Sequence, residues 1–314
     1  MTGLHPETAL SGLRDLLRGW RDLRGKSQLD LSLDAGISQR HLSFIETGRS
    51  VPSRETLLRV AEALDVPLRE RNALLLAAGY APAYPEPAWD APEMASIAAA
   101  LRRMLRQHEP FPAIVMDRYW DVVLTNDAAP RFFGHFVDLS ARPAPRNMLH
   151  LMFDPDGLRP FVANWKGVAR SLLARVRREA VGQVLDTRSK ALVAALLAYP
   201  GAGCARDAAA PAHMPVIPLS FVKDGDVLNY FSMVTTVGDP QTIAAQELRV
   251  ECMFPADDET ERLHATIMAE SAQAPRNGIA GCKLKAQAPP AAGRHGGETG
   301  HADHTPDRAR NPPH

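Results

Sequence analysis

Apolar side chains recur at intervals of three and four residues in five short segments near the N-terminus of this chain. Three of the segments follow a serine that can cap a helix, namely Ser27, Ser38 and Ser53. Glycines and prolines separate the segments from one another. The predicted helices cover residues 10–24, 28–35, 39–47, 54–64 and 67–79. The pattern therefore predicts an all-α domain of five helices over residues 8–79.

A proline-rich stretch, residues 80–92, comes next and is predicted to be a short, stiff linker. The following region, residues 93–270, mixes helical periodicity with short apolar runs of the kind found in strands. Helices are predicted over residues 94–108, 161–180 and 189–198. A hairpin is predicted around residues 117–119, and further strands over 216–222, 227–237 and 243–253. We therefore expect an α+β domain, with helices on one side of an antiparallel sheet.

The composition of residues 271–314 changes to Pro, Gly, Ala, His and Arg with almost no large apolar side chain, which predicts a disordered tail. Weak metal binding is the alternative for its histidines, which are His295, His301, His304 and His314. The three cysteines lie far apart and form no CxxC pair, which argues against a disulfide framework or a zinc site. Without a long apolar run or a signal-peptide pattern, we expect a cytoplasmic protein that makes no membrane contact.

The third predicted helix presents two different faces. Leu42 and Ile45 fall on the side that meets the other helices, whereas Gln39, Arg40, Ser43 and Phe44 cluster on the opposite side. Amide and guanidinium groups at the start of such a helix suit the major groove of DNA. Arg40 can fork onto guanine and Gln39 onto adenine, and Phe44 can meet a thymine methyl group. The alternative is a solvated surface in which Phe44 only packs locally.

Other side chains around this helix are candidates for contacts to DNA phosphates. Gln28 and Ser38 stand at helix starts, where backbone N–H groups favour anions. His41 is a phosphate candidate too, although its partly inward position favours core support. The loop and helix start that follow add three more candidates, Arg49, Ser53 and Arg54. Net charge gives little help, because 36 basic and 36 acidic side chains balance over the chain.

This region resembles the lambda-repressor-like, or XRE-family, helix-turn-helix domain. The resemblance rests on Ser27-Gln28-Leu29, Ala35-Gly36-Ile37-Ser38, Ile45-Glu46-Thr47-Gly48-Arg49 and Pro52-Ser53. It implies binding to a double-stranded DNA operator, and an ion pair between Arg21 of the first helix and Glu46 of the third. Such a pair would fix the third helix against the first.

Residues 93–270 resemble the PAS-like ligand-binding domain of MmyB-type transcription regulators. The resemblance rests on residues 112–126, 164–165, 171–175 and 247–256. It implies a pocket between sheet and helices that takes a small apolar or fatty-acid-like ligand. From the residues we expect a lining formed by Met116, Trp120, Leu124, Trp165, Arg170, Leu172, Phe231 and Met233. Arg170 and Arg175 are candidates to pair with a ligand carboxylate. The alternative is that these apolar residues are ordinary core and the arginines a solvated face.

Motifs of the common enzyme classes are absent from the sequence, among them HExxH, GxSxG, the P-loop and GxGxxG. We therefore expect no enzyme and no cofactor. The sequence predicts a DNA-binding transcription regulator that reads a two-fold symmetric operator as a homodimer and responds to a ligand through its linker. The alternative is a regulator whose second domain binds another protein. An enclosed apolar cavity of about 300 Å³ or more would favour the small-molecule sensor.

Overall fold

Five helices form the N-terminal region of the computed structural model, as predicted. The structure describes residues 6–181, 187–202 and 218–273. The five helices are α1 (Pro6–Leu23), α2 (Gln28–Asp34), α3 (Gln39–Glu46), α4 (Arg54–Ala63) and α5 (Leu68–Ala77). Trp20 and a set of leucines from these helices are almost fully buried in one shared apolar core. Because short helices are marginal on their own, this core holds them in place.

Local capping explains where these helices begin. The hydroxyls of Ser27, Ser38 and Ser53 accept hydrogen bonds from backbone N–H groups three residues later. Gly36 lies in the turn between α2 and α3 and takes a left-handed backbone conformation with φ of 61°. Glycine adopts that conformation without the steric penalty that a side chain brings. The serine caps fix where α2 and α3 begin, and the turn at Gly36 connects them into a helix-turn-helix pair.

The second region is α+β and contains a five-stranded antiparallel sheet in the order β2-β1-β5-β4-β3. The strands are β1 (Ala113–Met116), β2 (Val122–Thr125), β3 (Leu219–Lys223), β4 (Asp226–Thr236) and β5 (Arg249–Pro255). The helices are α6 (Ala95–Gln107), α7 (Ala128–Phe136), α8 (Met148–Phe153), α9 (Trp165–Val181), α10 (Thr187–Ala198), α11 (Ile243–Glu247) and α12 (Asp258–Gln273). Short 3₁₀ turns cover Pro92–Met94 and Arg159–Phe161.

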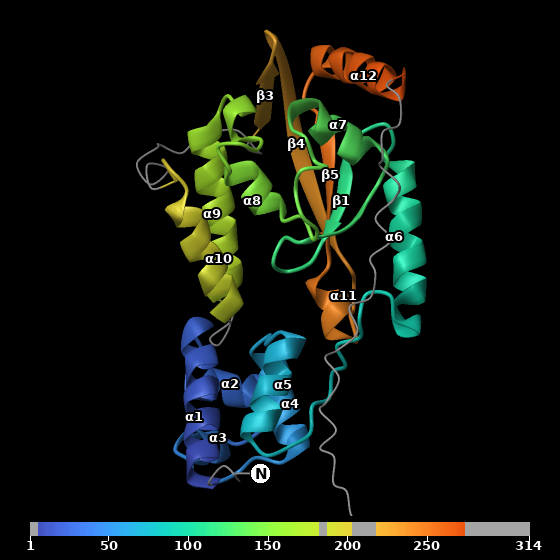
Figure 1. Cartoon of the computed structure of the whole chain (residues 1–314). Helices are drawn as coiled ribbons and strands as arrows, with labels where there is room; N and C mark the ends of the chain where they lie inside the picture. The colour runs from blue at the N-terminus through green and yellow to red at the C-terminus, as the bar shows by residue number, and fades with distance from the viewer. Residues whose placement is uncertain (1–5, 182–186, 203–217, 274–314) are drawn as a thin grey trace, which may run out of the picture. The chain divides into compact units, whose positions relative to one another are not determined.

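Helices cover both faces of the sheet, and not one side as the sequence suggested (Figure 1). The face that carries Ile114 and Met116 of β1 packs against α7, α8, α9 and α12, and we call it the cavity face. The face that carries Ala113 and Val115 packs against α6 and α11, and we call it the α6 face. Side chains alternate along a strand, so neighbouring residues of β1 enter two separate cores.

Three elements differ from the expectation. Residues 243–253 were predicted as one strand, but α11 occupies the first part and β5 starts only at Arg249. The hydroxyl of Thr242 accepts from Ala245 N and starts this short helix. Helices α7 and α12 were not predicted; α12 follows Asp257, whose carboxylate accepts from Thr260 N. The predicted tail, residues 271–314, lies almost wholly outside the described residues.

Candidate DNA-binding face and ligand cavity

The outward side of α3 carries the predicted base-reading side chains. Gln39 and Arg40 are exposed, and Ser43 and Phe44 are half-buried. Leu42 and Ile45 are buried against the other helices. The helix therefore has one face for packing and one open face, as the 3.6-residue period requires. His41 is half-buried at the margin between the two faces.

Phe44 organises the positive charge on this open face. The guanidinium of Arg40 lies 5.3 Å from the centroid of the Phe44 ring, and that of Arg49 lies 6.0 Å away. Cation–π attraction at this range holds both arginines beside the ring. The open face thus presents the guanidinium of Arg40 next to the exposed amide of Gln39, and the guanidinium of Arg49 lies beside it from the loop after α3.

The candidates for phosphate contacts lie around the same face. The Ser38 and Ser53 hydroxyls each accept a backbone N–H as helix caps. A hydroxyl that accepts can still donate its own hydrogen, and the Ser53 hydroxyl also shares a hydrogen bond with Thr56 Oγ1 at 2.9 Å. Arg49 and Arg54 are exposed. Gln28 is placed differently, because its Nε2 donates to Glu46 Oε2 at 2.7 Å. Its side chain supports Glu46, which needs donors because its carboxylate is out of water.

Glu46 ties α3 to α1. Its side chain is 0% exposed and accepts from Arg21 through Nε at 2.6 Å and Nη2 at 3.3 Å. This hydrogen bond raises the pKa of Arg21. The ion pair implied by the resemblance is thus present in the structure. It fixes the end of α3, and with it the direction of the open face.

A cavity of about 150 Å³ lies between the cavity face of the sheet and three helices. Its apolar walls come from the sheet and from α7, α8 and α9. The apolar lining residues are Ile114, Met116, Trp120, Phe133, Met148, Leu149, Met152, Val168, Leu172, Leu219 and Met253. This volume is half of the roughly 300 Å³ that would favour a small-molecule sensor. A cavity of about the same size in another protein nevertheless binds benzene.

Polar side chains enter the same cavity from α9 and the sheet: Ser171, Arg175, Ser232 and Glu251. Arg175 Nη1 lies 3.7 Å from Glu251 Oε2, and its guanidinium lies 4.5 Å from the Trp120 ring centroid. Among the described residues, neither Nε1 of Trp120 nor Oε2 of Glu251 has a hydrogen-bond partner, although both atoms are buried. Polar atoms buried without partners are unusual enough to require an explanation.

Three of the eight residues expected to line a pocket line this cavity: Met116, Trp120 and Leu172. Arg175, expected as a carboxylate partner, lines it as well, and Arg170 does not. Trp165 contacts Phe153, and its other side meets Arg159 at a separate surface hollow.

Leu124, Phe231 and Met233 lie on the α6 face, so the expectation that they share a face with Met116 is wrong. Strand register gives the reason. Leu124 pairs with Val115, Phe231 with Phe254 and Met233 with Cys252. Paired residues project to the same side of a sheet, and these partners belong to the core under α6.

Several lining residues were not among those predicted. Met148 and Met152 stand four residues apart in α8, a spacing that places both on one side of a helix and was visible in the sequence. Phe133 lies in the unpredicted α7. Glu251 gave no local signal, because only the register of β5 with β1 puts it opposite Ile114.

A tight turn, residues 117–121, contains the cavity residue Trp120. Asp117 accepts from the backbone N–H groups of Tyr119 and Asp121 at 2.8 Å and 3.0 Å. Burial raises the pKa of Asp117. Trp120 takes a left-handed backbone conformation with φ of 68°, which is rare for a bulky side chain. The turn thus holds the indole in place at the expense of local backbone strain.

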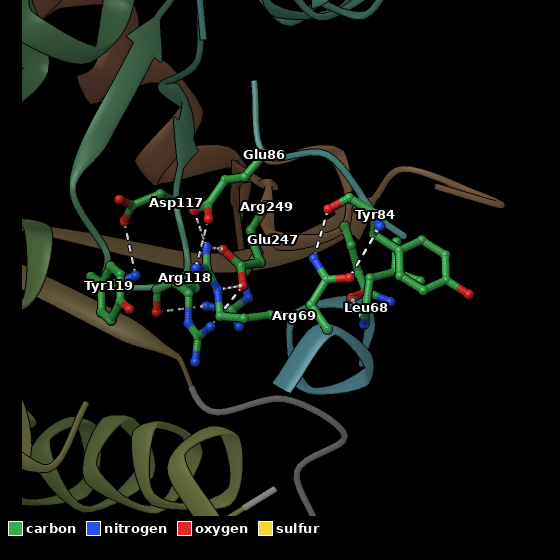
Figure 2. A network of polar contacts seen from close by, with 11 residues as sticks. Leu68, Arg69, Tyr84, Glu86, Asp117, Arg118, Tyr119, Glu247 and Arg249 are labelled. Atoms are coloured by element: carbon green, nitrogen blue, oxygen red, sulfur yellow. Dashed lines mark hydrogen bonds and ion pairs between the residues drawn. The ribbon is translucent and has the colours of Figure 1, made fainter. Parts of the chain in front are cut away.

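Figure 2 shows a polar network that joins this turn to α5 through Glu247 of α11. Glu247 Oε1 accepts from Arg118 Nη1 at 2.7 Å and from Arg69 Nε at 2.8 Å. Glu247 Oε2 accepts from Arg69 Nη2 at 3.0 Å. Arg69 also donates to Glu86, which lies in the predicted linker. Hydrogen bonding to Glu247, followed by that to Glu86, raises the pKa of Arg69. Arg118 is 6% exposed, so its end of the network is shielded from water, whereas Glu86 lies at the exposed end.

Metal sites and membrane-spanning helices are absent from the described part of the chain. The described part of the chain contains no group of three or more metal-binding side chains. None of its helices has the length and the apolar character needed to cross a membrane.

Comparison with known proteins identifies both regions. The family model for the MmyB-like transcription regulator ligand binding domain matches residues 97–266. A helix-turn-helix family model matches residues 17–71. The transcriptional regulator ClgR from Mycobacterium tuberculosis strains CDC 1551 / Oshkosh and ATCC 25618 / H37Rv is 40% identical over 65 residues in each case. The match covers 21% of this chain and spans about half, 55%, of the length of these relatives.

Proposed function

The chain belongs to the MmyB-like transcription regulator ligand-binding domain family, and on that premise we propose that it regulates transcription by binding DNA and a small molecule. The observation that carries the DNA-binding part is the open face of α3. There Arg40 lies over the Phe44 ring beside the exposed Gln39, while Arg49, a phosphate candidate from the loop after α3, lies against the same ring. Guanidinium and amide groups at the start of a helix match the hydrogen-bonding edges of guanine and adenine in the major groove.

Replacement of Arg40 tests this role. Genomic fragments selected by the purified chain serve as the probe in a mobility-shift assay. We expect Arg40→Ala to weaken specific binding by about 1–3 kcal/mol, the range for one bidentate base contact. Arg18→Ala is the matched control, because it removes an exposed arginine from α1, outside the open face. Equal losses in the two variants would contradict base reading by Arg40.

The chain is proposed to act as a homodimer on a two-fold symmetric operator. One recognition helix covers only a few base pairs, so a second copy on a neighbouring half-site is needed for useful specificity. Light scattering of the complex with the selected fragment should give two chains per site. A single chain bound at full affinity would contradict this part of the proposal.

Coupling between cavity and DNA is proposed to run through the turn at residues 117–121. Trp120 lines the cavity, and Arg118, two residues before it, holds Glu247. Glu247 in turn holds Arg69 at the start of α5. Leu68 N of the same helix donates to Gln246, and Arg69 also binds Glu86 of the linker. A ligand acts on DNA binding only if it favours one arrangement of these contacts over another.

The low-molecular-weight fraction of a cell extract provides the first test of sensing. We expect it to change the affinity of the chain for its selected fragment. Glu247→Gln should reduce that change, whereas Glu261→Gln, an exposed control on α12, should preserve it. An equal response from both variants would argue against the Glu247 route.

A protein-interaction role for the second domain remains the alternative. The observation in its favour is apolar exposure on β4, where Val227, Met233 and Val234 are 45%, 55% and 39% exposed. In that case the protein fraction of the extract, and not the low-molecular-weight fraction, would change DNA affinity.

A further inference from the structure

We propose that the cavity takes a neutral, single-ring molecule that carries a hydroxyl or amide group, an inference that rests on the sensing function proposed above. The volume is the first reason. At about 150 Å³ the cavity matches one that binds benzene. Pockets for larger ligands occupy about 300–1,000 Å³. A long acyl chain would therefore need an enlarged cavity, whereas a substituted benzene ring does not.

The walls favour a ring over a flexible chain. Four methionines line the cavity, Met116, Met148, Met152 and Met253, together with Phe133. Thioether sulfur makes favourable contacts with aromatic rings, and methionine side chains adjust to the shape of what they enclose. Phe133 adds an aromatic surface against which a ring can stack or meet edge to face.

The polar side chains define the substituent. The indole N–H of Trp120 can only donate a hydrogen bond, and the carboxylate of Glu251 can only accept one. Trp120 is 2% exposed, and within the described part of the chain its Nε1 and the Oε2 of Glu251 lack hydrogen-bond partners. A hydroxyl or an amide accepts from the first group and donates to the second. A purely apolar ligand would leave both atoms without a hydrogen bond, which is costly in a buried site.

Charge on the ligand is disfavoured because the cavity already holds an ion pair. Glu251 and Arg175 lie 3.7 Å apart and balance each other. A ligand carboxylate would compete with Glu251 for Arg175 and would leave one of the two anions poorly paired. A ligand ammonium would meet Arg175, which lies over the Trp120 ring. A ligand carboxylate is therefore repelled by Glu251 and a ligand ammonium by Arg175, whereas a neutral molecule is repelled by neither.

Four probes with a common toluene body test this inference by calorimetric titration of the full chain: p-cresol, toluene, p-toluate and 4-methylbenzylamine. We expect p-cresol to bind about tenfold or more tightly than each of the other three. Trp120→Phe should weaken p-cresol about tenfold and leave toluene unchanged. Glu251→Gln should strengthen p-toluate about tenfold, because the carboxylate that competes with the ligand for Arg175 is then absent. Glu261→Gln is the matched control and should leave all four affinities unchanged.

The gain of p-toluate binding in Glu251→Gln cannot arise from misfolding, and toluene binding reports that the cavity persists in each variant. Tightest binding of p-toluate by the unaltered chain, with no effect of Glu251→Gln, would overturn the proposed ligand class. If no probe binds while the low-molecular-weight extract still changes DNA affinity, the ligand class alone is wrong. If neither probes nor extract has any effect, the sensing function itself is wrong.

Discussion

The buried carboxylate of Glu46 allows a quantitative test of how α3 is held. Its side chain is 0% exposed and depends on two hydrogen bonds from Arg21 and one from Gln28. Arg21→Met keeps the apolar stem of the arginine and removes its charge, which leaves a buried anion with one amide donor. Breaking a buried pair from one side costs about 3–5 kcal/mol. We expect the N-terminal helices to lose stability of that order.

Hydrogen exchange followed by mass spectrometry is the suitable assay, because peptides from α1 to α3 report local stability whatever the second region does. A global melting curve would mix the two regions. In the double variant Arg21→Met/Glu46→Leu no buried charge remains, so stability should return to within about 1 kcal/mol of the unaltered chain. A loss below about 1 kcal/mol for Arg21→Met, or a double variant less stable than the single one, would refute this reasoning.

Three further predictions concern other parts of the chain. His264 is fully buried; its Nδ1 accepts from the Tyr230 hydroxyl at 2.7 Å, and its Nε2 donates to a backbone carbonyl. Burial lowers the pKa of His264, so its contribution to thermal stability should be constant above about pH 6.5 and fall below it, and His264→Gln should remove that part of the fall. Arg49→Ala should lower the salt slope of DNA binding by about 1 without altering sequence preference; a changed preference would contradict a phosphate role. Gly36→Ala should destabilise the α2–α3 turn by about 1 kcal/mol in hydrogen exchange, because φ is 61° there while the new Cβ would lie an ordinary 3.8 Å from Arg59.

The N-terminal helices were predictable because their signals are local. Each cap lies within three residues of the N–H group that it satisfies, and Gly36 marks its own turn. The open face of α3 follows from helical periodicity once the helix is placed. A local signal of the same kind exists at α11, where Thr242 caps a helix inside an apolar run whose hydrophobicity favours a strand.

The cavity was only partly predictable, because its lining depends on strand pairing between distant segments. A shift of one residue in register moves every side chain of a strand to the other face. Ser232 lies on the cavity face since it pairs with Met253, and its neighbours Phe231 and Met233 therefore face α6. A prediction from hydrophobicity alone prefers Phe231 and Met233 to Ser232 as lining residues, but these two side chains lie on the opposite face of the sheet.

The contacts made by the turn at residues 117–121 could not be predicted from the sequence. Nothing in the sequence pairs Arg118 with Glu247, a residue 129 positions away. A left-handed backbone at a bulky residue costs about 1–3 kcal/mol, and at Trp120 the burial of the indole and the two backbone hydrogen bonds to Asp117 offset this. Because Arg118 and Trp120 share this one turn, we expect a change in the backbone of Trp120 to shift the guanidinium that binds Glu247. The strained turn therefore connects the cavity, through Trp120, with the contacts of α5, through Arg118 and Glu247. A ligand that changes the conformation of this turn would act at the position that the proposed coupling needs.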